Sequence, residues 1–318
     1  MTNRASIRRP LRVTCAAAVG MAVAACGGGP STGTDDAREA NADTRGLAVR
    51  LLAPGATPRR ALRYRHDEGH VENVLVRLAI QEIAESGGQA QMGGTPPISL
   101  LVRLGPTRLD GSLVEIPVVI DMAQAAVPAE VDPEAAAAIQ RQVEPLSRVR
   151  GVLVTDRLGR TRGTRVPLPP DVSFETAQML GDIRATLMTV PLPEEQVGVG
   201  ARWETTRETQ AGPIRHITQT VVYTVSEMTS DGPVLQVTFR GSAPQQPLTD
   251  PTREADVDVT LDAYESTGVG SARVDLHALT AFSELDFSNM SRATLARGGV
   301  SQPARSERRM RVEVSPDL

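Results

Sequence analysis

The sequence predicts a mainly β (α+β) fold: a curved antiparallel sheet or half-barrel with one or two helices packed on its concave side. Alternation of apolar and polar residues recurs from about Leu62 onward, which is typical of strands with one buried face. Turn signals at Asp110-Gly111, Leu158-Gly159 and Asp231-Gly232 separate these segments, since glycine accepts positive φ. We therefore expect a single β-rich domain over residues 59–318.

The inward face of three predicted strands can be read from this alternation. In each segment the apolar residues are two positions apart, and successive side chains of a strand point to opposite faces of the sheet. The segment 256–264 has the most regular pattern, because its outward positions are acidic. The inward sets are Val74, Val76, Leu78 and Ile80; Val257, Val259, Leu261 and Ala263; and Met310, Val312 and Val314.

The last predicted strand, residues 307–314, places Arg309, Arg311 and Glu313 on its outward face. The outward acids Asp258 and Asp262 have the complementary charge. Opposite charges on neighbouring strands stabilise a pairing. We therefore hypothesise that these two segments are neighbours in the sheet.

Two segments have the helical period. Asp132 is a suitable N-cap and Pro133 a suitable first residue for an alanine-rich helix that runs to Val143. The segment Ser173–Met188 is amphipathic, and proline-containing arms at 166–169 and 190–193 flank it. We expect this second helix to lie as a clip across the sheet. Its apolar side carries Phe174, Ala177, Leu180, Ile183 and Leu187.

The composition excludes several function classes. The chain has 318 residues, a formal net charge of −4 and only 3% aromatic residues, so it lacks the basic and aromatic surfaces that nucleic acids require. All 34 basic residues are arginine, and without lysine there is no Schiff-base lysine, Ser–Lys dyad or P-loop lysine. We expect no nucleic-acid partner.

The N-terminus has the anatomy of an export signal. Arg4, Arg8, Arg9 and Arg12 precede a short apolar stretch, Val13–Val23, that is below the roughly 20 residues of a membrane-spanning helix. The next residues, Val23-Ala24-Ala25-Cys26, resemble the lipobox of bacterial lipoproteins. The resemblance implies a signal peptide over residues 1–25 and lipid on Cys26.

Acylation of Cys26 would attach the mature chain to a membrane, since several acyl chains on one residue anchor a protein durably. Residues 26–58, rich in small and polar residues, are then a flexible tether. Gly27 follows the cysteine. An aspartate at this position would favour retention in the inner membrane. By resemblance to lipoproteins of two-membrane bacteria, the glycine implies an outer membrane lipoprotein of the cell envelope that faces the periplasm or the cell surface.

A second resemblance rests on Pro191-Leu192-Pro193 and on residues 197–204, Val-Gly-Val-Gly-Ala-Arg-Trp-Glu. This stretch is similar to an uncharacterised family of β-rich bacterial envelope lipoproteins, with a likeness that would extend from about Leu52 to the C-terminus. The resemblance implies a single secreted domain and assigns no catalytic or ligand position. Independently, Trp203 is the only tryptophan, and we expect it to fill the core beneath the clip helix.

Candidate chemistry is sparse. His66 and His70 form the densest group of metal-type ligands, with Asp67, Glu68 and Glu72 beside them, but Gly69 indicates a turn that does not make them converge. No nucleophile, zinc-helix, calcium-loop or phosphate-loop motif is present. We expect no metal, no cofactor, no catalytic residue and no enzymatic activity.

Three function classes remain open. The first is a binding module for an apolar ligand such as a lipid, on a face formed by Phe174, Leu180, Ile183, Leu187 and Trp203; the half-barrel lipid carriers of bacterial envelopes are similar at the level of fold. The second is a structural or assembly lipoprotein that contacts other envelope components. The third, a hydrolase, is the least favoured of the three.

The lipobox makes a prediction about the mature protein. We expect it in the membrane fraction, with acylated Cys26 as its first residue, because the thiol is the only lipid-accepting group of the motif. Intact-mass measurement of the purified chain tests this. Recovery from the cytosol with the first 25 residues intact, or in soluble form with an unmodified terminus, would contradict it.

Overall fold

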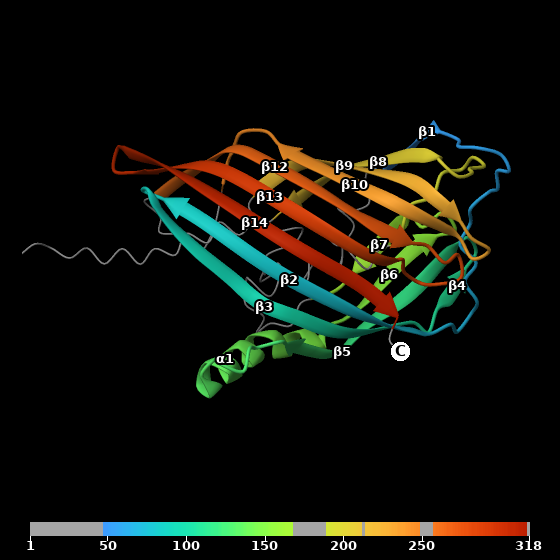
Figure 1. The fold of residues 1–318 in the computed structure, drawn as a ribbon, viewed down its shortest axis with the longest axis horizontal. Helices are drawn as coiled ribbons and strands as arrows, with labels where there is room; N and C mark the ends of the chain where they lie inside the picture. The colour runs from blue at the N-terminus through green and yellow to red at the C-terminus, as the bar shows by residue number, and fades with distance from the viewer. Residues whose placement is uncertain (1–46, 168–188, 212–213, 249–256, 317–318) are drawn as a thin grey trace, which may run out of the picture.

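The computed structural model describes residues 47–167, 189–211, 214–248 and 257–316, which form one antiparallel sheet and one α-helix (Figure 1). The strands in the first half of the chain are β1 (Ala48–Ala53), β2 (Glu72–Ser86), β3 (Gln89–Leu104), β4 (Arg108–Asp110), β5 (Leu113–Ala125), β6 (Arg150–Asp156) and β7 (Thr161–Arg165). Those in the second half are β8 (Arg202–Ala211), β9 (Ile214–Met228), β10 (Pro233–Ala243), β11 (Gln246–Pro247), β12 (Val257–Arg273), β13 (Phe282–Arg297) and β14 (Val300–Pro316). The helices are α1 (Pro133–Val143) and the 3-10 helix η2 (Glu144–Arg148).

The sheet has a simple order along its width. It runs β1-β8-β9-β10-β12-β13-β14-β2-β3-β5-β6-β7, while β11 pairs with β12 and β4 with β5. Most neighbours are consecutive in the chain, as expected for antiparallel strands joined by tight turns. In the pairs β3–β5 and β10–β12 only a short strand, β4 or β11, lies between the partners in the chain. The long-range pairings are those of β1 with β8 and of the C-terminal strand β14 with β2, which joins the two halves of the chain.

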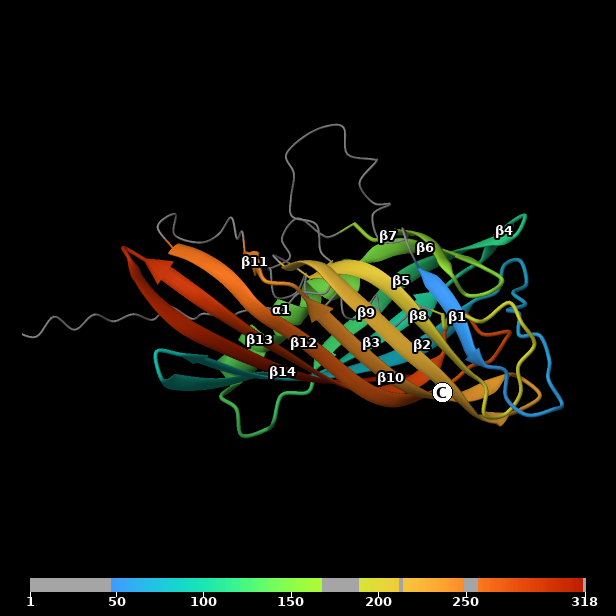
Figure 2. The ribbon, with the colours of Figure 1, turned by 90° about the horizontal axis from the view of Figure 1, so that it is seen from above.

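The sheet is strongly curved (Figure 2). Leu158, in the turn between β6 and β7, packs in the same apolar cluster as Trp203 of β8 and Leu235 of β10. Inward side chains from distant strands can meet only when the sheet curls toward the face that carries them. The predicted fold class, a curved antiparallel sheet with a helix packed on it, is therefore confirmed.

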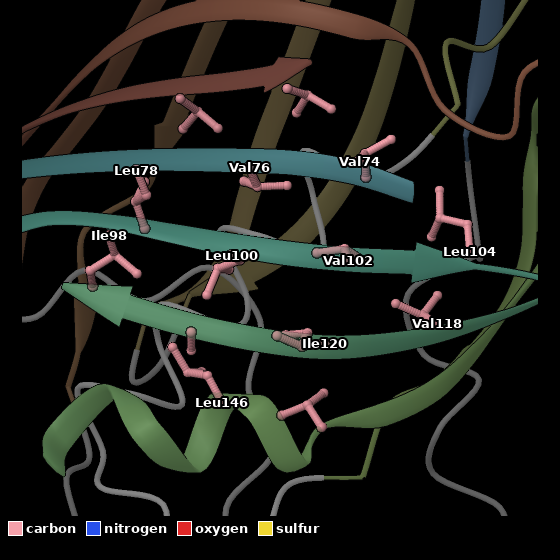
Figure 3. Packing of buried hydrophobic residues seen from close by; sticks show 14 of the residues in the cluster. Val74, Val76, Leu78, Ile98, Leu100, Val102, Leu104, Val118, Ile120 and Leu146 are labelled. Carbon is pink, nitrogen blue, oxygen red and sulfur yellow. The ribbon is translucent and has the colours of Figure 1, made fainter. Parts of the chain in front are cut away.

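The largest apolar cluster lines β2, β3 and β5, where inward residues alternate with outward ones (Figure 3). The predicted inward set of β2, Val74 to Ile80, is buried, and so are Met310, Val312 and Val314 of β14. A second cluster surrounds Trp203, and a third lies around Ile217 and Leu261. Apolar burial of this extent is the main stabilising term of a fold that the described residues build without a disulfide.

Helix α1 begins as predicted. The side chain of Asp132 accepts hydrogen bonds from the amides of Glu134 (2.9 Å) and Ala135 (3.3 Å), and Pro133 is the first helical residue. Gln140 ties the helix to the end of β5, because its side-chain amide bonds the main chain on both sides of residue 124, at Ala123 and Ala125 (3.0 Å each). In Figure 3, Leu146 of η2 lies beside the inner face of β5.

Three details of the sequence analysis need correction. Residues 47–58 were assigned to the tether, but they contain β1, which pairs with β8 from Ala48 to Ala53. This strand is short, and its partner lies about 150 residues further along the chain, so no local pattern indicated the pairing.

The second correction concerns β12. The expected inward Ala263 is only half-buried, because a bulge after Leu261 shifts the alternation and buries Tyr264.

The third correction concerns the neighbours of β14. This strand pairs with β13 and β2, so Arg309 and Arg311 do not face Asp258 and Asp262 of β12. Arg311 instead forms an ion pair with Glu284 of β13. An arginine of β14 does pair with an acid on a neighbouring strand, as opposite charges favour. Several strands carry outward acids, however, and the strand order decides which acid becomes the partner.

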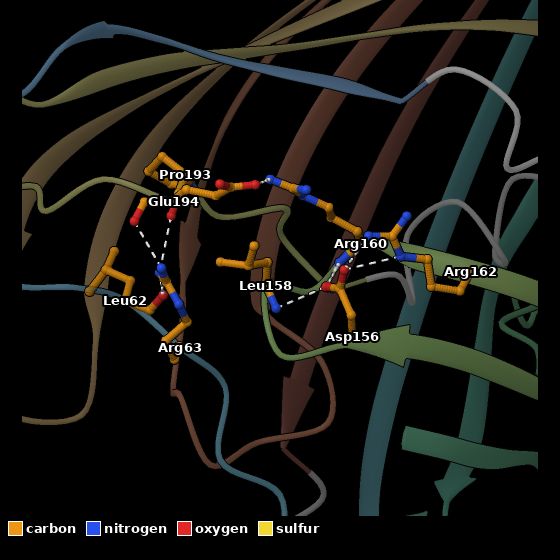
Figure 4. A network of polar contacts seen from close by, with 8 residues as sticks. All are labelled: Leu62, Arg63, Asp156, Leu158, Arg160, Arg162, Pro193 and Glu194. Atoms are coloured by element: carbon orange, nitrogen blue, oxygen red, sulfur yellow. Dashed lines mark hydrogen bonds and ion pairs between the residues drawn. The ribbon is translucent and has the colours of Figure 1, made fainter. Parts of the chain in front are cut away.

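Main-chain carbonyls near residue 193 are held by one arginine (Figure 4). The guanidinium of Arg63 donates to the carbonyls of Leu62 (2.6 Å), Pro193 (3.2 Å) and Glu194 (2.8 Å). The carboxylate of Glu194 in turn pairs with Arg160, beyond β6 (2.9 Å). These contacts join the loop before β2, the loop before β8 and the β6–β7 turn.

The β6–β7 turn itself is organised by Asp156 (Figure 4). Its carboxylate accepts from the amides of Leu158 (2.9 Å) and Arg160 (3.0 Å) and from the guanidinium of Arg162 (2.6 Å). Gly159 adopts φ +71°, and a side chain there would meet the ring of Tyr64. The turn can therefore pack closely against the loop before β2.

Trp203 is fully buried, as expected. Its ring stacks on Tyr223 with centroids 5.5 Å apart, and its Nε1–H donates to the carbonyl of Pro191 (2.8 Å). The proline-containing segment that precedes β8 is thus attached to the core. The expected clip helix, Ser173–Met188, lies outside the described residues.

Replacement of Trp203 by alanine is expected to lower the free energy of unfolding by about 3–5 kcal/mol, because it leaves a cavity and a carbonyl without its donor. Denaturant unfolding measures this. Trp203→Phe keeps an aromatic ring on Tyr223 and should lose less. Equal stability of the alanine variant and the parent would show that Trp203 is not a core residue.

Candidate functional site

A row of polar side chains, interrupted by one glycine, crosses the largely apolar concave face. The row runs directly from strand to strand, with each residue opposite the next in the antiparallel register. We call it the polar belt. From β8 to β2 its members are Arg207, Gln219, Gly241, Ser266, Asn289, Arg308 and Glu82.

The belt residues point toward the concave side because of the two-residue period. Arg308 is two positions before Met310, which belongs to the largest core cluster, and Gln219 is two positions after the buried Ile217. Arg308 is only 6% exposed and Ser266 only 2%. The polar belt is therefore part of the interior and is not a solvated outer face.

Hydrogen bonds connect the belt members in pairs. Arg207 donates from Nε to Oε1 of Gln219 (2.9 Å), on the adjacent strand. The hydroxyl of Ser266 donates to Oδ1 of Asn289. Such cross-strand bonds satisfy part of the polar capacity of the belt, as buried polar groups require.

Near Arg308 the belt is widened by buried hydroxyls. Ser291 and Ser306 face each other on β13 and β14, one inward position further along, and both are almost fully buried. Ser306 donates to the carboxylate of Glu82 (3.4 Å), which is opposite Arg308. This end of the belt thus combines one guanidinium, one carboxylate, one amide and several hydroxyl groups.

On its other side the belt borders an aromatic pair. Phe239 of β10 and Phe287 of β13 make an edge-to-face contact, with centroids 5.5 Å apart. They meet across Gly268 of the intervening strand β12, where a Cβ would lie 2.7 Å from the ring of Phe287. Both rings face the concave side and are half-buried, so this apolar surface is only partly covered.

The geometry therefore offers an amphipathic surface inside the curve of the sheet. Inward positions on one strand are two residues apart, which is about 7 Å along the strand. An apolar row and a row with hydrogen-bond donors lie side by side at that spacing. Such a surface fits a molecule with an apolar part and a polar end better than it fits a purely apolar one.

Most site residues expected from the sequence fall outside this description. Phe174, Leu180, Ile183 and Leu187, as well as the lipidation residue Cys26, lie outside the described residues. Trp203 is described, and it lies in the cluster around Tyr223, four residues before Arg207 on β8. It is on the same concave face as the belt, but its side chain is fully buried.

The belt was missed, although the sequence carried part of its signal. The alternation that places Met310, Val312 and Val314 inward also places Ser306 and Arg308 inward when it is continued toward the N-terminus. The predicted inward set began at Met310, and the inward position before it, Arg308, is charged. The cross-strand alignment of the belt depends on register, which no local pattern contains.

The histidines of the 66–70 turn are in a different place, near the start of β2. His66 stacks on Tyr64, with centroids 5.6 Å apart, and its two ring nitrogens are buried. Burial, together with the nearby charge of His70, lowers the pKa of His66 below its ordinary value of 6.5. Burial also raises the pKa of Glu72, whose Oε2 accepts from the amide of Leu279 (2.6 Å).

Within the described ranges, no group of three or more His, Cys, Asp or Glu residues is arranged to hold a metal ion. The same residues include no helix whose length and hydropathy would let it span a membrane.

No protein-family model and no curated protein matches the chain. Solved structures give weak similarities. An exported protein with a YmcC-like fold from Bacteroides fragilis is 8% identical, with 78% of this chain and 97% of that chain covered and a TM-score of 0.19. An anion-selective porin from Comamonas acidovorans is 10% identical, with 77% and 100% covered and a TM-score of 0.23.

A loop-deletion mutant of OmpT, an outer membrane protein of Vibrio cholerae, is 9% identical, with 78% of this chain and 100% of that chain covered and a TM-score of 0.21. These neighbours are an exported protein and outer membrane proteins. TM-scores this low carry no argument about the activity or location of this chain. The lipobox and the lipoprotein family remain predictions from the sequence.

The environment of His66 gives a pH dependence. Because its pKa is lower in the folded chain, the unfolded state binds the proton more readily, and stability is lost as the pH falls through about 6.5. His66→Phe keeps a ring on Tyr64 and removes this loss. Urea unfolding of the parent and the variant at about pH 7.5 and about pH 5.5 tests it.

Glu72 has the opposite effect on the pH dependence of stability. Its pKa is raised in the folded chain, so its contribution to the free energy of unfolding is lost as the pH rises. It is present in both proteins, so the difference between them reports on His66. An equal loss of unfolding free energy in parent and variant on acidification would contradict the assignment.

Proposed function

We propose that the protein is a lipid-anchored lipoprotein of the cell envelope that binds the apolar part of a lipid on the concave face of its sheet. The observation that carries the proposal is the half-buried aromatic pair Phe239 and Phe287. These rings are on the inner surface, where a structural core would enclose them fully. An acyl chain against them would remove apolar surface from water.

The curvature supports the same proposal. A concave sheet presents inward side chains from many strands to one molecule, which is how apolar ligands are usually enclosed. Val221 of β9, opposite Phe239 in the register, is also inward and half-buried. The apolar row thus continues from β9 through β10 and β13 to Met310 of β14.

The anchor and the binding face belong to one proposal. Lipid on Cys26 would hold the chain at a membrane surface, where its ligand is abundant, while residues 27–46 precede the first described strand. Residence in the outer membrane follows from Gly27 after the cysteine and is proposed with it. A structural or assembly role is the alternative outcome of the experiment below.

Binding can be measured with a neutral fluorescent probe, N-phenyl-1-naphthylamine, on the chain that begins at Gly27. This chain retains every described residue and has no acylated cysteine. We expect saturable binding that Phe239→Ala and Phe287→Ala each weaken about threefold to tenfold, because each removes apolar contact surface. Native mass spectrometry of the same preparation should show a co-purified lipid.

Val269→Ala is the matched control. Val269 is on β12 next to Gly268 but points outward and is 62% exposed, so its truncation should leave probe binding unchanged. Thermal unfolding of each variant separates loss of binding from loss of fold. A folded parent that neither binds the probe nor carries a lipid would reject the binding function and favour the assembly role.

A further inference from the structure

We infer that the Arg308 end of the polar belt is a subsite for the anionic headgroup of the bound lipid. This inference rests on the proposed function, because it assigns the polar end of a molecule whose apolar part lies on the aromatic row. The groups that form the subsite are on three adjacent strands. They are Ser266 of β12, Asn289 and Ser291 of β13, and Ser306 and Arg308 of β14.

The donor set has the right chemistry for a phosphate or a carboxylate. A guanidinium has N–H donors and no acceptor, and serine hydroxyls and an asparagine amide can also donate. Hydrogen bonds from a cation to an anionic oxygen are the strong ones, and more so where water is excluded. Arg308, Ser291 and Ser306 already have polar interactions, so a headgroup would join an existing network.

The charge of the belt contrasts with that of the rest of the chain. It contains two arginines, Arg207 and Arg308, and one carboxylate, Glu82, in a protein of net charge −4. Several arginines on the outer face are in exposed ion pairs, such as Arg77 with Glu313 and Arg103 with Asp121. The excess of positive charge within the belt would attract an anion to it.

A stable fold alone does not require this charge. Removing an arginine from water costs free energy, and apolar residues of similar volume in place of buried ion pairs are often neutral or stabilising. The neighbouring inward row shows that the sheet accommodates apolar residues here, since Met310 and Phe287 face each other next to Arg308 and Asn289. The polar row is thus an exception that a ligand with a polar end would explain.

The position of the subsite relative to the aromatic row fits an amphiphile. Asn289 is two residues from Phe287, and Arg308 is two residues from Met310, so each polar position is about 7 Å from an apolar one on its own strand. A headgroup at Arg308 would leave its acyl chain on the side of Phe287 and Phe239. No additional element is needed to connect the two parts.

The test compares two lipids with the same acyl chain, lysophosphatidylglycerol and lysophosphatidylcholine, as competitors of N-phenyl-1-naphthylamine on the chain from Gly27. We expect the anionic lipid to bind about tenfold more tightly. Arg308→Gln should abolish this preference. Asn289→Ala should reduce it severalfold, which keeps the inference testable if Arg308→Gln does not fold.

Arg309→Gln is the matched control, because Arg309 is the next residue on β14 but faces outward and pairs with Glu307. It should keep the preference. Glycerol phosphate, the headgroup without a chain, should not compete at concentrations where the lipid does. Equal affinity for both lipids, or tight binding of glycerol phosphate alone, would overturn the headgroup subsite.

These outcomes are distinct from failure of the proposed function. If probe and lipids bind but charge has no effect, the lipid-binding function stands and the subsite is wrong. If neither lipid displaces the probe, or the probe does not bind, the lipid-binding function itself is wrong. Loss of preference in Arg309→Gln as well as in Arg308→Gln would show a general charge effect and would also overturn the subsite.

Discussion

The antiparallel pairing of β12, β13, β14 and β2 constrains the rest of the structure. From Ser283↔Val314 to Arg297↔Val300 the β13–β14 pairing has no register shift, and β14 continues it onto β2. Because side chains alternate strictly between faces, each inward position on one strand is beside an inward position on the next. The β12–β13 pairing is likewise unshifted from Ala263 to Arg273. Polar and apolar rows across these strands are a consequence of this register.

Local patterns were sufficient for the elements and for one face of each strand. The inward set of β2 and the capped start of α1 at Asp132 required only the two-residue period and N-cap chemistry. Strand order required more. The outward arginines of β14 could pair with acids on β12 or on β13. No local pattern in the sequence indicates which of these strands is the neighbour, and the structure pairs Arg311 with Glu284 of β13. A bulge such as that after Leu261 is similarly invisible, because one extra residue changes the facing of all residues after it.

The candidate site was only partly accessible for the same reason. Arg308 could have been placed inward from its own strand, whereas its position between Asn289 and Glu82 follows from the joining of the C-terminal strand to β2. Other polar contacts between residues far apart in the chain were equally inaccessible to local sequence patterns. Arg63 bonds the carbonyls of Pro193 and Glu194, about 130 residues away, and nothing near Arg63 in the sequence indicates these partners.

Arginines on the outer face of the sheet are exposed, whereas Arg308 on the concave face is buried. This difference determines how binding of an anion would change the stability of the fold. An exposed pair such as Arg77–Glu313 contributes about 0–1 kcal/mol and is screened by salt. Arg308 is removed from water, so its contribution depends on how well its surroundings replace hydration. An anion that binds there would stabilise the folded state through its own affinity, because it binds the folded chain and not the unfolded one. The polar belt would then make the concave face most stable when it is occupied, which a row of apolar residues in the same register would not do.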